Sequence, residues 1–237
     1  MLQQPRELAA LVDAAGSDMA TLHDPVVRYH SGNEIDSDSC LDWHAQLLMS
    51  AAETDDIHDA EICVGVCQFL TVQLGEGSFS SAELDDYSQE ASMFCPVFDN
   101  SSVTGEVDDQ FREPINDALL VLSAIVLDPL HGHDLGVWMV AELIHRMLPG
   151  NNGLVLLDPS PLPEPAEPMQ HLEAVEKLSR HWQTKLGVVP IDRHPGILGQ
   201  STAYVHLPRA RAALRRPDPI AVPVEHLAHC PELPLSH

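Results

Sequence analysis

Residues 118–158 constrain the fold more than any other part of the chain, because two apolar runs flank one amphipathic segment. The first run, ALLVLSAIVLD at 118–128, has the length and composition of a strand buried on both faces. The segment 135–148 has helical spacing, with an apolar side and a polar side. The second run, GLVLLD at 153–158, is another buried strand. This order predicts two neighbouring parallel strands joined by a right-handed crossover through the helix.

The segments before residue 118 give weaker signals. Apolar side chains at helical spacing predict helices over 1–20 and 39–53. The run EICVGVCQFLTVQL at 61–74 is rich in β-branched and aromatic residues, which predicts a strand that ends at Gly75. Residues 75–117 are acidic with little periodicity, and we expect one short helix between loops there.

The segments after the second apolar run begin with DPSPLPEPAEP, whose prolines predict an extended, stiff loop over 158–168. Residues 171–186 have one apolar face and predict a helix. Two short strands are predicted at GVVPI (187–191) and at STAYVHLP (201–208). After Arg216 the chain is rich in proline and histidine, and we expect it to be irregular.

The chain carries a formal net charge of −24 at pH 7, and this charge is unevenly distributed. Residues 1–117 hold 24 acidic residues against three arginines, whereas residues 118–237 hold 12 acidic residues against nine lysines and arginines. Such a field repels nucleic-acid backbones and acidic membranes, so we expect neither as a partner. Two interpretations remain open for the charge: a solubilising or salt-adapted surface, and the steering of a cationic ligand.

Several features favour a cytoplasmic protein. The five cysteines are an odd, scattered set, which is typical of reduced thiols. The N-terminus lacks a basic start followed by an apolar block, and the longest apolar stretch, Ala118–Leu127, is about half as long as a bilayer requires. Cys63 and Cys67 are four residues apart on a predicted strand, so we expect both to be buried on one face. The oligomeric state stays open, a homodimer included.

Three segments, in this order, resemble motifs of the GNAT family of acyl-CoA-dependent N-acyltransferases. HGHDLG at 131–136 stands where the family has Arg/Gln-x-x-Gly-x-Gly/Ala between a buried strand and a helix, and it is a degenerate form of that motif. NGLVLLDPSP stands where the next strand and its cofactor-lining end belong. SRHWQTKLGVV resembles the family's Ala-x-x-Phe-Tyr-x-x-Leu-Gly-Phe helix end. The resemblance covers residues 118–208, and the strand at 61–74 fits an earlier family strand.

The resemblance implies an α/β fold with a mixed, partly splayed central β-sheet and helices on both faces. It implies one acyltransferase domain over residues 1–216, followed by a Pro/His-rich tail over 217–237. It also implies acetyl-CoA as the co-substrate, with the thioester between the strands at 118–128 and 153–158.

The resemblance further implies which residues bind the cofactor. Backbone amides at a helix start, helped by the helix dipole, grip a pyrophosphate. The corresponding loop here comprises His131, Gly132, His133, Asp134, Leu135, Gly136 and Val137. His131 takes the place of the leading Arg or Gln. Splayed strands would leave backbone groups to pair with the pantetheine arm, at Ile125, Val126 and Leu127, with Asp158 at the end of the next strand.

Asp134 departs from the family pattern, because it replaces a glycine and brings a negative charge toward a phosphate. At an effective dielectric constant of about 20, one like charge at ~4 Å costs on the order of 4 kcal/mol. Asp is also a favoured helix N-cap residue. We hypothesise that its carboxylate accepts hydrogen bonds from the amides of Gly136 and Val137, so that the anion site is filled from within the chain.

Catalytic groups are less well defined. Many relatives use a Tyr in the last helix as the acid for the leaving thiolate, but the matching residue here is Gln183, an amide. Other candidate proton donors are His171, His181, Tyr204 and His206. Glu61 and Asp128 are candidate bases or water-orienting carboxylates, although both positions also suit surface turns.

Other site chemistries are disfavoured. The segment HGHD offers three ligand types in four residues, but adjacent ligands in a tight turn seldom close on one ion, so we expect no metal. The two cysteines at 63 and 67 lack a second Cys/His pair at zinc-finger spacing. The sequence contains no Gly-x-Ser-x-Gly elbow, and no P-loop lysine follows its glycines.

The sequence therefore predicts an acetyl-CoA-dependent N-acetyltransferase that acts on a small-molecule or peptide amine by direct attack in a ternary complex. In the family the N-terminal half builds the acceptor side, so the acidic residues 1–117 predict a cationic acceptor. The alternative is a catalytically inactive relative, an acidic binding or regulatory module in which the cofactor cleft is vestigial.

Overall fold

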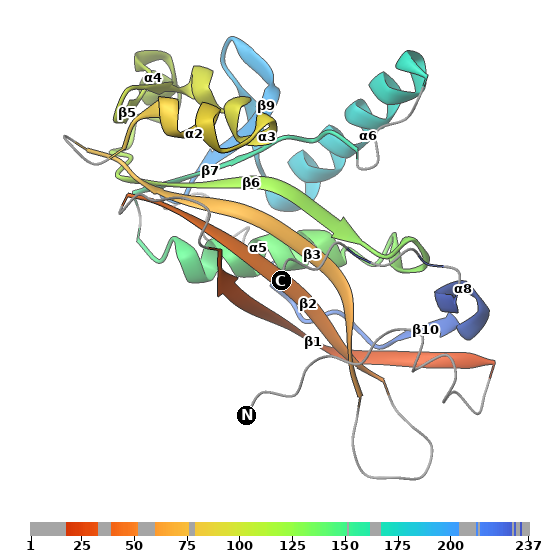
Figure 1. The fold of residues 1–237 in the computed structure, drawn as a ribbon. Coiled ribbons are helices and arrows are strands. Elements are labelled where there is room, and N and C mark those ends of the chain that lie inside the picture. Colours follow the sequence, from red (N-terminus) through yellow and green to blue (C-terminus); the bar gives the residue numbers. More distant parts are fainter. Residues whose placement is uncertain are drawn as a thin grey trace.

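The centre of the molecule is one eight-stranded sheet with the strand order β10-β1-β2-β3-β6-β7-β9-β8 (Figure 1). The structure is a computed structural model, and it describes residues 18–32, 39–51, 60–75, 79–150, 152–161, 167–203, 212, 214–228, 230 and 233. The strands are β1 (Met19–Ser31), β2 (Cys40–Ala51), β3 (Ala60–Gln73), β6 (Asp117–Val126), β7 (Gly153–Leu157), β8 (Val189–Ile191), β9 (His194–Ser201) and β10 (Ile220–Pro223). All neighbours are antiparallel except β6 and β7, which are parallel.

Helices cover both faces of this sheet, as Figure 1 shows. Between β3 and β6 lie α2 (Ser81–Tyr87), α3 (Gln89–Ser92), η1 (Cys95–Val97), the small hairpin of β4 (Phe98–Asp99) and β5 (Ser102–Val103), and α4 (Gly105–Phe111). The connection from β6 to β7 contains η2 (Asp128–Leu130) and α5 (Leu135–Met147). Two more helices are α6 (Pro168–Leu186) and α8 (Val224–Ala228). The fold is therefore α/β with a large, mostly antiparallel sheet.

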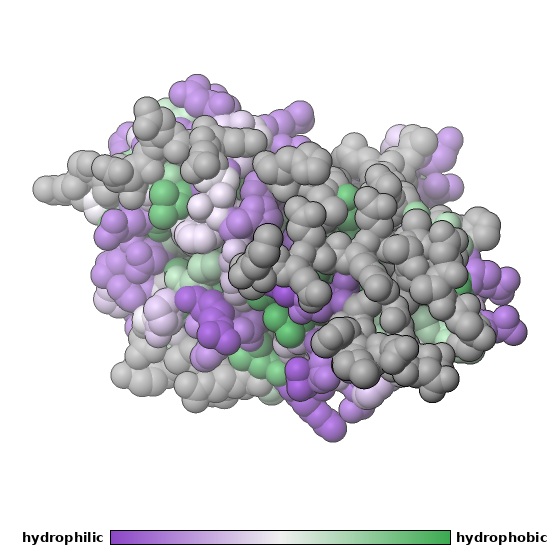
Figure 2. Space-filling model, turned by 60° about the horizontal axis from the view of Figure 1, so that its bottom comes forward, coloured by the Kyte–Doolittle hydropathy of each residue, from purple (hydrophilic) through white to green (hydrophobic). Residues whose placement is uncertain are grey.

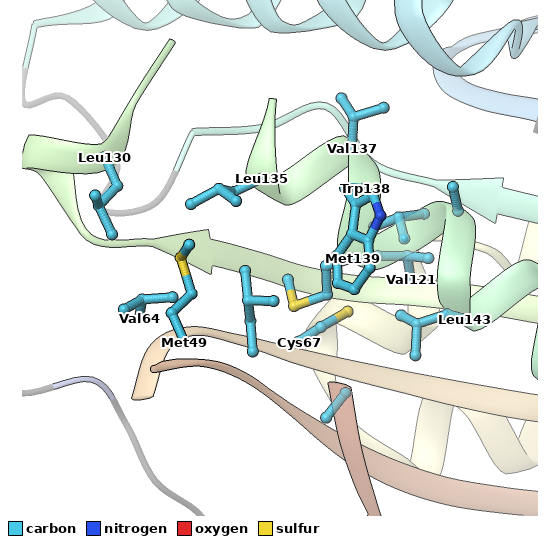
Figure 3. Close-up of a cluster of buried hydrophobic side chains, with 14 of the residues drawn as sticks. Met49, Val64, Cys67, Val121, Leu130, Leu135, Val137, Trp138, Met139 and Leu143 are labelled. Atoms are coloured by element: carbon cyan, nitrogen blue, oxygen red, sulfur yellow. The ribbon is translucent and has the colours of Figure 1, made fainter. Parts of the chain in front are cut away.

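Two hydrophobic clusters form on opposite faces of the sheet. The first lies beneath α5, where Trp138, Met139 and Leu143 point toward strand residues such as Cys67 and Val121 (Figure 3). The second lies beneath the helices between β3 and β6, and includes Leu70, Leu84, Phe94, Leu120 and Leu156. Because β3 and β6 contribute to both clusters, their side chains are buried on both faces.

The strand–helix–strand prediction is confirmed. The runs at 118–128 and 153–158 form β6 and β7, the segment 135–148 forms α5, and the two strands pair in parallel from Asp117↔Gly153 to Val121↔Leu157. The strand predicted at 61–74 is β3. The helix predicted at 171–186 is α6, which begins three residues earlier, at Pro168.

The predicted helix at 39–53 is wrong, because residues 40–51 form β2 in the interior of the sheet. Alternate residues Ala45, Leu47, Met49 and Ala51 belong to the cluster beneath α5. Leu, Met, Ala and Gln favour helices in isolation, but long ladders with β1 and β3 on either side override that preference. Of the helix predicted at 1–20, residues 1–17 lie outside the described residues, while Met19 and Ala20 begin β1.

The region 75–117 holds more structure than the single short helix that we expected, since α2, α3 and α4 all lie within it. Each of the first two has a serine cap: Ser80 accepts from the amide of Ala82, and Ser88 from that of Ala91. Each of these helices is short and contributes few buried apolar residues, such as Leu84, Ala91 and Phe94. Acidic residues stand between these positions, so no helical periodicity was visible in the sequence.

One further expectation fails near the C-terminus, and another lies mostly outside the described residues. Of the strand predicted at 201–208 only residues 201–203 are described, and Ser201 is the last residue of β9. A glycine inside this strand is required, because a Cβ at Gly199 would lie 2.8 Å from both Ile191 Cδ1 and Leu156 Cδ2. The segment after Arg216 is not irregular throughout, since 220–223 form β10, which pairs with β1, and 224–228 form α8.

A bulge in β3 separates Cys63 from Cys67. Pairing with β2 shifts between Leu47↔Gly65 and Leu48↔Cys63, which leaves Val64 as the extra residue. Cys67 and Val64 both belong to the cluster beneath α5, so Cys63 faces the other side of the sheet and is only half-buried. The expectation of one shared, buried face is therefore wrong.

Exposed surface on the lower face of the molecule is mostly hydrophilic where the residues are described, with small, separate hydrophobic areas (Figure 2). Among the helices of the described ranges, none combines the length and apolar composition needed to cross a bilayer.

Burial predicts an order of thiol reactivity. Burial raises the pKa of Cys63 to about 11 and of Cys40 to about 12, and it raises the pKa of the fully buried Cys67 further. Because the thiolate is the reactive form, Cys40 and Cys67 should be the slowest to react with a disulfide reagent at neutral pH, and the half-buried Cys95 and Cys230 the fastest. Mass spectrometry of partly labelled protein would give the order. Early labelling of Cys67 in the folded protein would contradict its burial.

Candidate functional site

The turn between β6 and α5 has two residues in left-handed conformations. Gly132 has φ +89° and Asp134 has φ 58°. Glycine adopts such angles freely, and Asp is one of the few other residues that tolerate them. This explains in physical terms why a glycine suits position 134 and how an Asp can replace it.

The side chain of Asp134 does not cap α5. Asp134 is the N-cap residue by position, but its carboxylate makes no capping hydrogen bond. Its Oδ2 instead accepts a hydrogen bond from Lys185 Nζ, at 2.7 Å, in the last turn of α6. An N-cap side chain needs an extended backbone to reach the amides, and Asp134 has a left-handed one. The hypothesis of an internal anion on Gly136 and Val137 is therefore wrong.

The first amides of α5 remain available. The carbonyl of Asp134 accepts from the amide of Trp138, which is the first bond of the helix. No hydrogen bond within the described part of the chain uses the amides of Leu135, Gly136 or Val137. These are amides of a first turn, which a helix cannot satisfy from within.

A pocket of about 660 Å³ opens beside this helix start. It is lined by Gly132, His133, Asp134, Val137, Trp138, Thr184, Lys185, Ala212, Arg215, Arg216, Pro217, Asp218, Pro219 and Ile220. Three of the chain's 12 lysines and arginines lie here, although the chain carries 36 acidic residues. The lining also holds Asp134 and Asp218, so three cations stand against two carboxylates in a chain that is otherwise strongly acidic, and we call it the cationic pocket.

The cations of this pocket differ in their partners. Lys185 pairs with Asp134, and Arg216 pairs with Asp24 on β1 at 3.0 Å. Arg215 is exposed and has no acidic partner among the described residues. A hydrogen bond of 3.2 Å from Trp138 Nε1 to the carbonyl of Leu214 joins the segment that carries both arginines to α5.

The pocket residues from the C-terminal segment were missed by the sequence prediction. The run RARAALRR at 209–216 contains four arginines in a chain that has only 12 basic residues, and this was the available signal. Lys185 was missed because it lies 51 positions from Asp134, and only the contact between α5 and α6 brings the two together.

Strands β6 and β7 part next to the helix start. Their pairing ends at Val121↔Leu157, whereas β6 continues to Val126 and pairs there only with β3. The carbonyl of Val126 accepts a 2.9 Å hydrogen bond from His131 Nε2, and the amide of Leu127 donates to Val64 at 3.0 Å. Of the three residues whose backbone was predicted to bind a pantetheine arm, Val126 and Leu127 thus have these partners, and Ile125 is paired with Val66 in the ladder with β3.

Asp158, predicted to line the cofactor, lies in the loop that follows β7. Its Oδ1 accepts from the amide of Ser160 at 3.0 Å and from the hydroxyl of Ser160 at 2.8 Å. Leu135 and Val137 are buried in the core by their side chains, so only their backbone atoms face the turn.

The two predicted catalytic residues that the structure describes, Glu61 and Asp128, have separate partners. Glu61 forms an ion pair with Arg28 and lies four residues before Gly65, where the pairing of β3 with β6 ends. The side chain of Asp128 is 86% exposed and lies 3.7 Å from His131. Tyr204 and His206 are outside the described residues. His171 and His181 lie on α6, as does Gln183, whose amide donates to Ser179 at 2.9 Å.

A pair of histidines on β1 and β2 was also missed. His30 and His44 are register partners, and their rings stack with centroids 5.4 Å apart. His30 Nε2 is buried and has no hydrogen-bond partner among the described residues. Burial, followed by the proximity of His44, holds the pKa of His30 below its usual range. The signal was absent because residues 39–53 were interpreted as a helix, where His44 has no cross-strand neighbour.

Comparisons of the chain with protein-family models, with curated proteins and with solved structures find no match in any of the three. Within the described ranges, no group of three His, Cys, Asp or Glu side chains is arranged to hold a metal ion. The cationic pocket and the polar residues of the sheet are therefore the two features on which a function is proposed.

The His30 pair predicts how stability depends on pH. A lowered pKa in the folded state means that the unfolded state binds the proton more tightly, so stability is present above the unfolded pKa near 6.5 and is lost as the pH falls below it. Replacing His30 with Gln should therefore reduce the loss of thermal stability between about pH 7.5 and pH 5.5. His145→Gln, on the exposed side of α5, is the matched control. If wild type and His30→Gln lost equal thermal stability over this pH range, His30 would not be the group responsible for the loss.

Proposed function

We propose that this chain is an acetyl-CoA-dependent N-acetyltransferase with a GNAT-like fold. The cationic pocket carries the proposal, because it lies at the first turn of α5, the helix that connects the parallel strands β6 and β7. A mixed sheet with one parallel pair and helices on both faces agrees with the layout that the resemblance implies. The acceptor class is an amine, small or peptidic.

The pocket suits a phosphorylated ligand in both charge and size. Arg215 and Lys185 supply charge-assisted donors, and the amides of Gly136 and Val137 lie at a helix start, where the dipole favours an anion. A volume of about 660 Å³ is that of a site for a cofactor-sized molecule. The apolar lining from Trp138 and Ile220 suits the non-phosphate part of such a ligand.

The chemistry needs few groups from the protein. Acetyl-CoA supplies the thioester carbon: the amine nitrogen forms a C–N bond to it, the C–S bond breaks, and the thiolate leaves with the electron pair and takes up the proton that the amine has lost. Gln183 stands where relatives carry an acid, and an amide does not transfer a proton. Rate enhancement in this chain would therefore rest on positioning rather than on a dedicated acid.

Asp134 acts against ligand binding in this proposal. Its carboxylate neutralises Lys185 and stands in the pocket wall. A ligand phosphate would compete with Asp134 for the lysine. The same pair favours the second candidate, an inactive module, since a permanently neutralised Lys185 would leave the pocket with little affinity for phosphate.

Acetyl-CoA titration into the wild-type protein by calorimetry separates the two candidates. We expect binding, and release of the free CoA thiol when an amine is added. Lys185→Met and Arg215→Met should each weaken binding by about tenfold, because each removes a charge-assisted hydrogen bond. Lys177→Met, an exposed lysine of α6 outside the pocket, should leave it unchanged. Wild-type protein that neither binds nor turns over acetyl-CoA would support the inactive module.

Replacing Asp134 with Asn isolates the charge effect. Asn tolerates the left-handed backbone but carries no charge, so it frees Lys185 without straining the turn. We expect acetyl-CoA to bind about tenfold more tightly, the full Coulomb term being reduced by solvent at this half-exposed side chain. In a Lys185→Met background the gain should shrink. Unchanged affinity in Asp134→Asn would show that the carboxylate does not oppose the ligand.

A further inference from the structure

One row of polar side chains crosses four neighbouring strands. The register places His30 opposite His44, His44 opposite Gln68, and Gln68 opposite Ser123. The residues that alternate with them, such as Tyr29, Ala45 and Cys67, pack in the cluster beneath α5. The row therefore faces the other side of the sheet, which is the side of α2 and α3.

This row is only partly covered. Further along the same strands, Leu70, Val72 and Leu120 are buried beneath the helices between β3 and β6. All four members of the row are half-buried, and Gln68 Nε2 donates a 2.9 Å hydrogen bond to the hydroxyl of Tyr87 at the end of α2. The row thus marks the edge of the covered face.

The charges around the row favour a cationic ligand. The imidazole, amide and hydroxyl groups of the row each offer an acceptor atom as well as a donor, and no lysine or arginine stands in the row. The nearest cation on the same face, Arg28, is paired with Glu61. Helix α2 adds Asp85 and Asp86 on the exposed side of this region. These carboxylates attract ammonium groups to this surface and repel phosphates.

The row begins at the proposed reaction centre. Ser123 lies in the part of β6 beyond its last pair with β7. From there the row runs across β3 to β2, two strand spacings or roughly 10 Å, before it reaches His44. A histidine at that distance cannot serve as the base for the attacking amine, which needs a hydrogen bond to it directly or through one water. The row is therefore suited to holding the remote part of an acceptor.

We propose that this row binds the extended chain of a linear polyamine. Its terminal primary amine would lie at Ser123, a second nitrogen at the Gln68–Tyr87 pair and a third at His44, with His30 stacked against His44 to hold its ring. Three- and four-carbon spacers separate the nitrogens of such chains by close to one strand spacing. The proposal rests on the acetyl transfer proposed above, since it makes the polyamine the acceptor of that reaction.

Calorimetry without acetyl-CoA tests the row directly. The probes are spermidine, butylamine and hexamminecobalt, which has the charge of spermidine but no chain. The titrations are done at about 0.15 M salt, which screens the charge of the general acidic surface. Spermidine should bind about tenfold more tightly than butylamine or hexamminecobalt. His44→Gln should weaken spermidine binding by about tenfold and leave hexamminecobalt unaffected. His145→Gln, on the opposite face, should change neither.

Tyr87→Phe is the second variant, because it removes one hydroxyl and leaves the core intact. Tyr87→Phe should weaken spermidine binding several-fold. If circular dichroism shows that His44→Gln is unfolded, the result with Tyr87→Phe tests the proposal instead. Equal binding of spermidine to wild type and to the folded row variants would overturn the proposal. Acetyl-CoA titration of the same proteins tells the two proposals apart: loss of spermidine selectivity with acetyl-CoA binding intact rejects the row alone, and absent acetyl-CoA binding rejects the transferase.

Discussion

The pairing of β3 with β6 is the constraint on which the rest of the structure depends. Both strands are covered on both faces, so a slip of one residue would move every apolar side chain to the opposite cluster. The register places Val126 opposite Gly65. A Cβ on residue 65 would lie only 2.9 Å from the carbonyl oxygen of Ile125, so the two strands approach closely there. The pairing with β3 continues to Val126, the last residue of β6, and the turn into α5 follows directly.

The packing of α5 against the sheet positions the pocket. The buried side chains of Leu135, Val137 and Trp138 hold the start of α5 against the sheet, and the indole of Trp138 joins the arginine-bearing segment to the helix. β10 pairs with β1, so the C-terminal segment is held at both ends of the residues that line the pocket. The pocket is therefore made from three parts of the chain that are far apart in sequence.

The sequence predicted correctly those elements whose apolar pattern lies within the element itself, and it missed features that depend on contacts between distant segments. β6, α5 and β7 were predictable because each carries its own apolar pattern within a few turns or residues. β2 was not, since its apolar spacing fits a helix and only its neighbours make it a strand. The loop 131–137 was placed correctly at a helix start, but the partner of Asp134 was not, because Lys185 and Asp134 meet only through the packing of α5 and α6. The polar row depends on registers, which no local pattern encodes.

The charge distribution links the two sites. An acidic protein repels an anionic thioester and attracts an amine at long range. The proposed binding of acetyl-CoA would therefore require a local region of positive charge, and Lys185, Arg215 and Arg216 line the pocket. The proposed amine acceptor would need no such region, and the row offers hydrogen-bond acceptors in an acidic region. Asp134 lines the pocket, and its pairing with Lys185 lowers the positive charge there. In the proposed reaction the acidic surface would attract the acceptor at long range and the row would hold it, whereas the thioester would depend on the few contacts of the pocket alone.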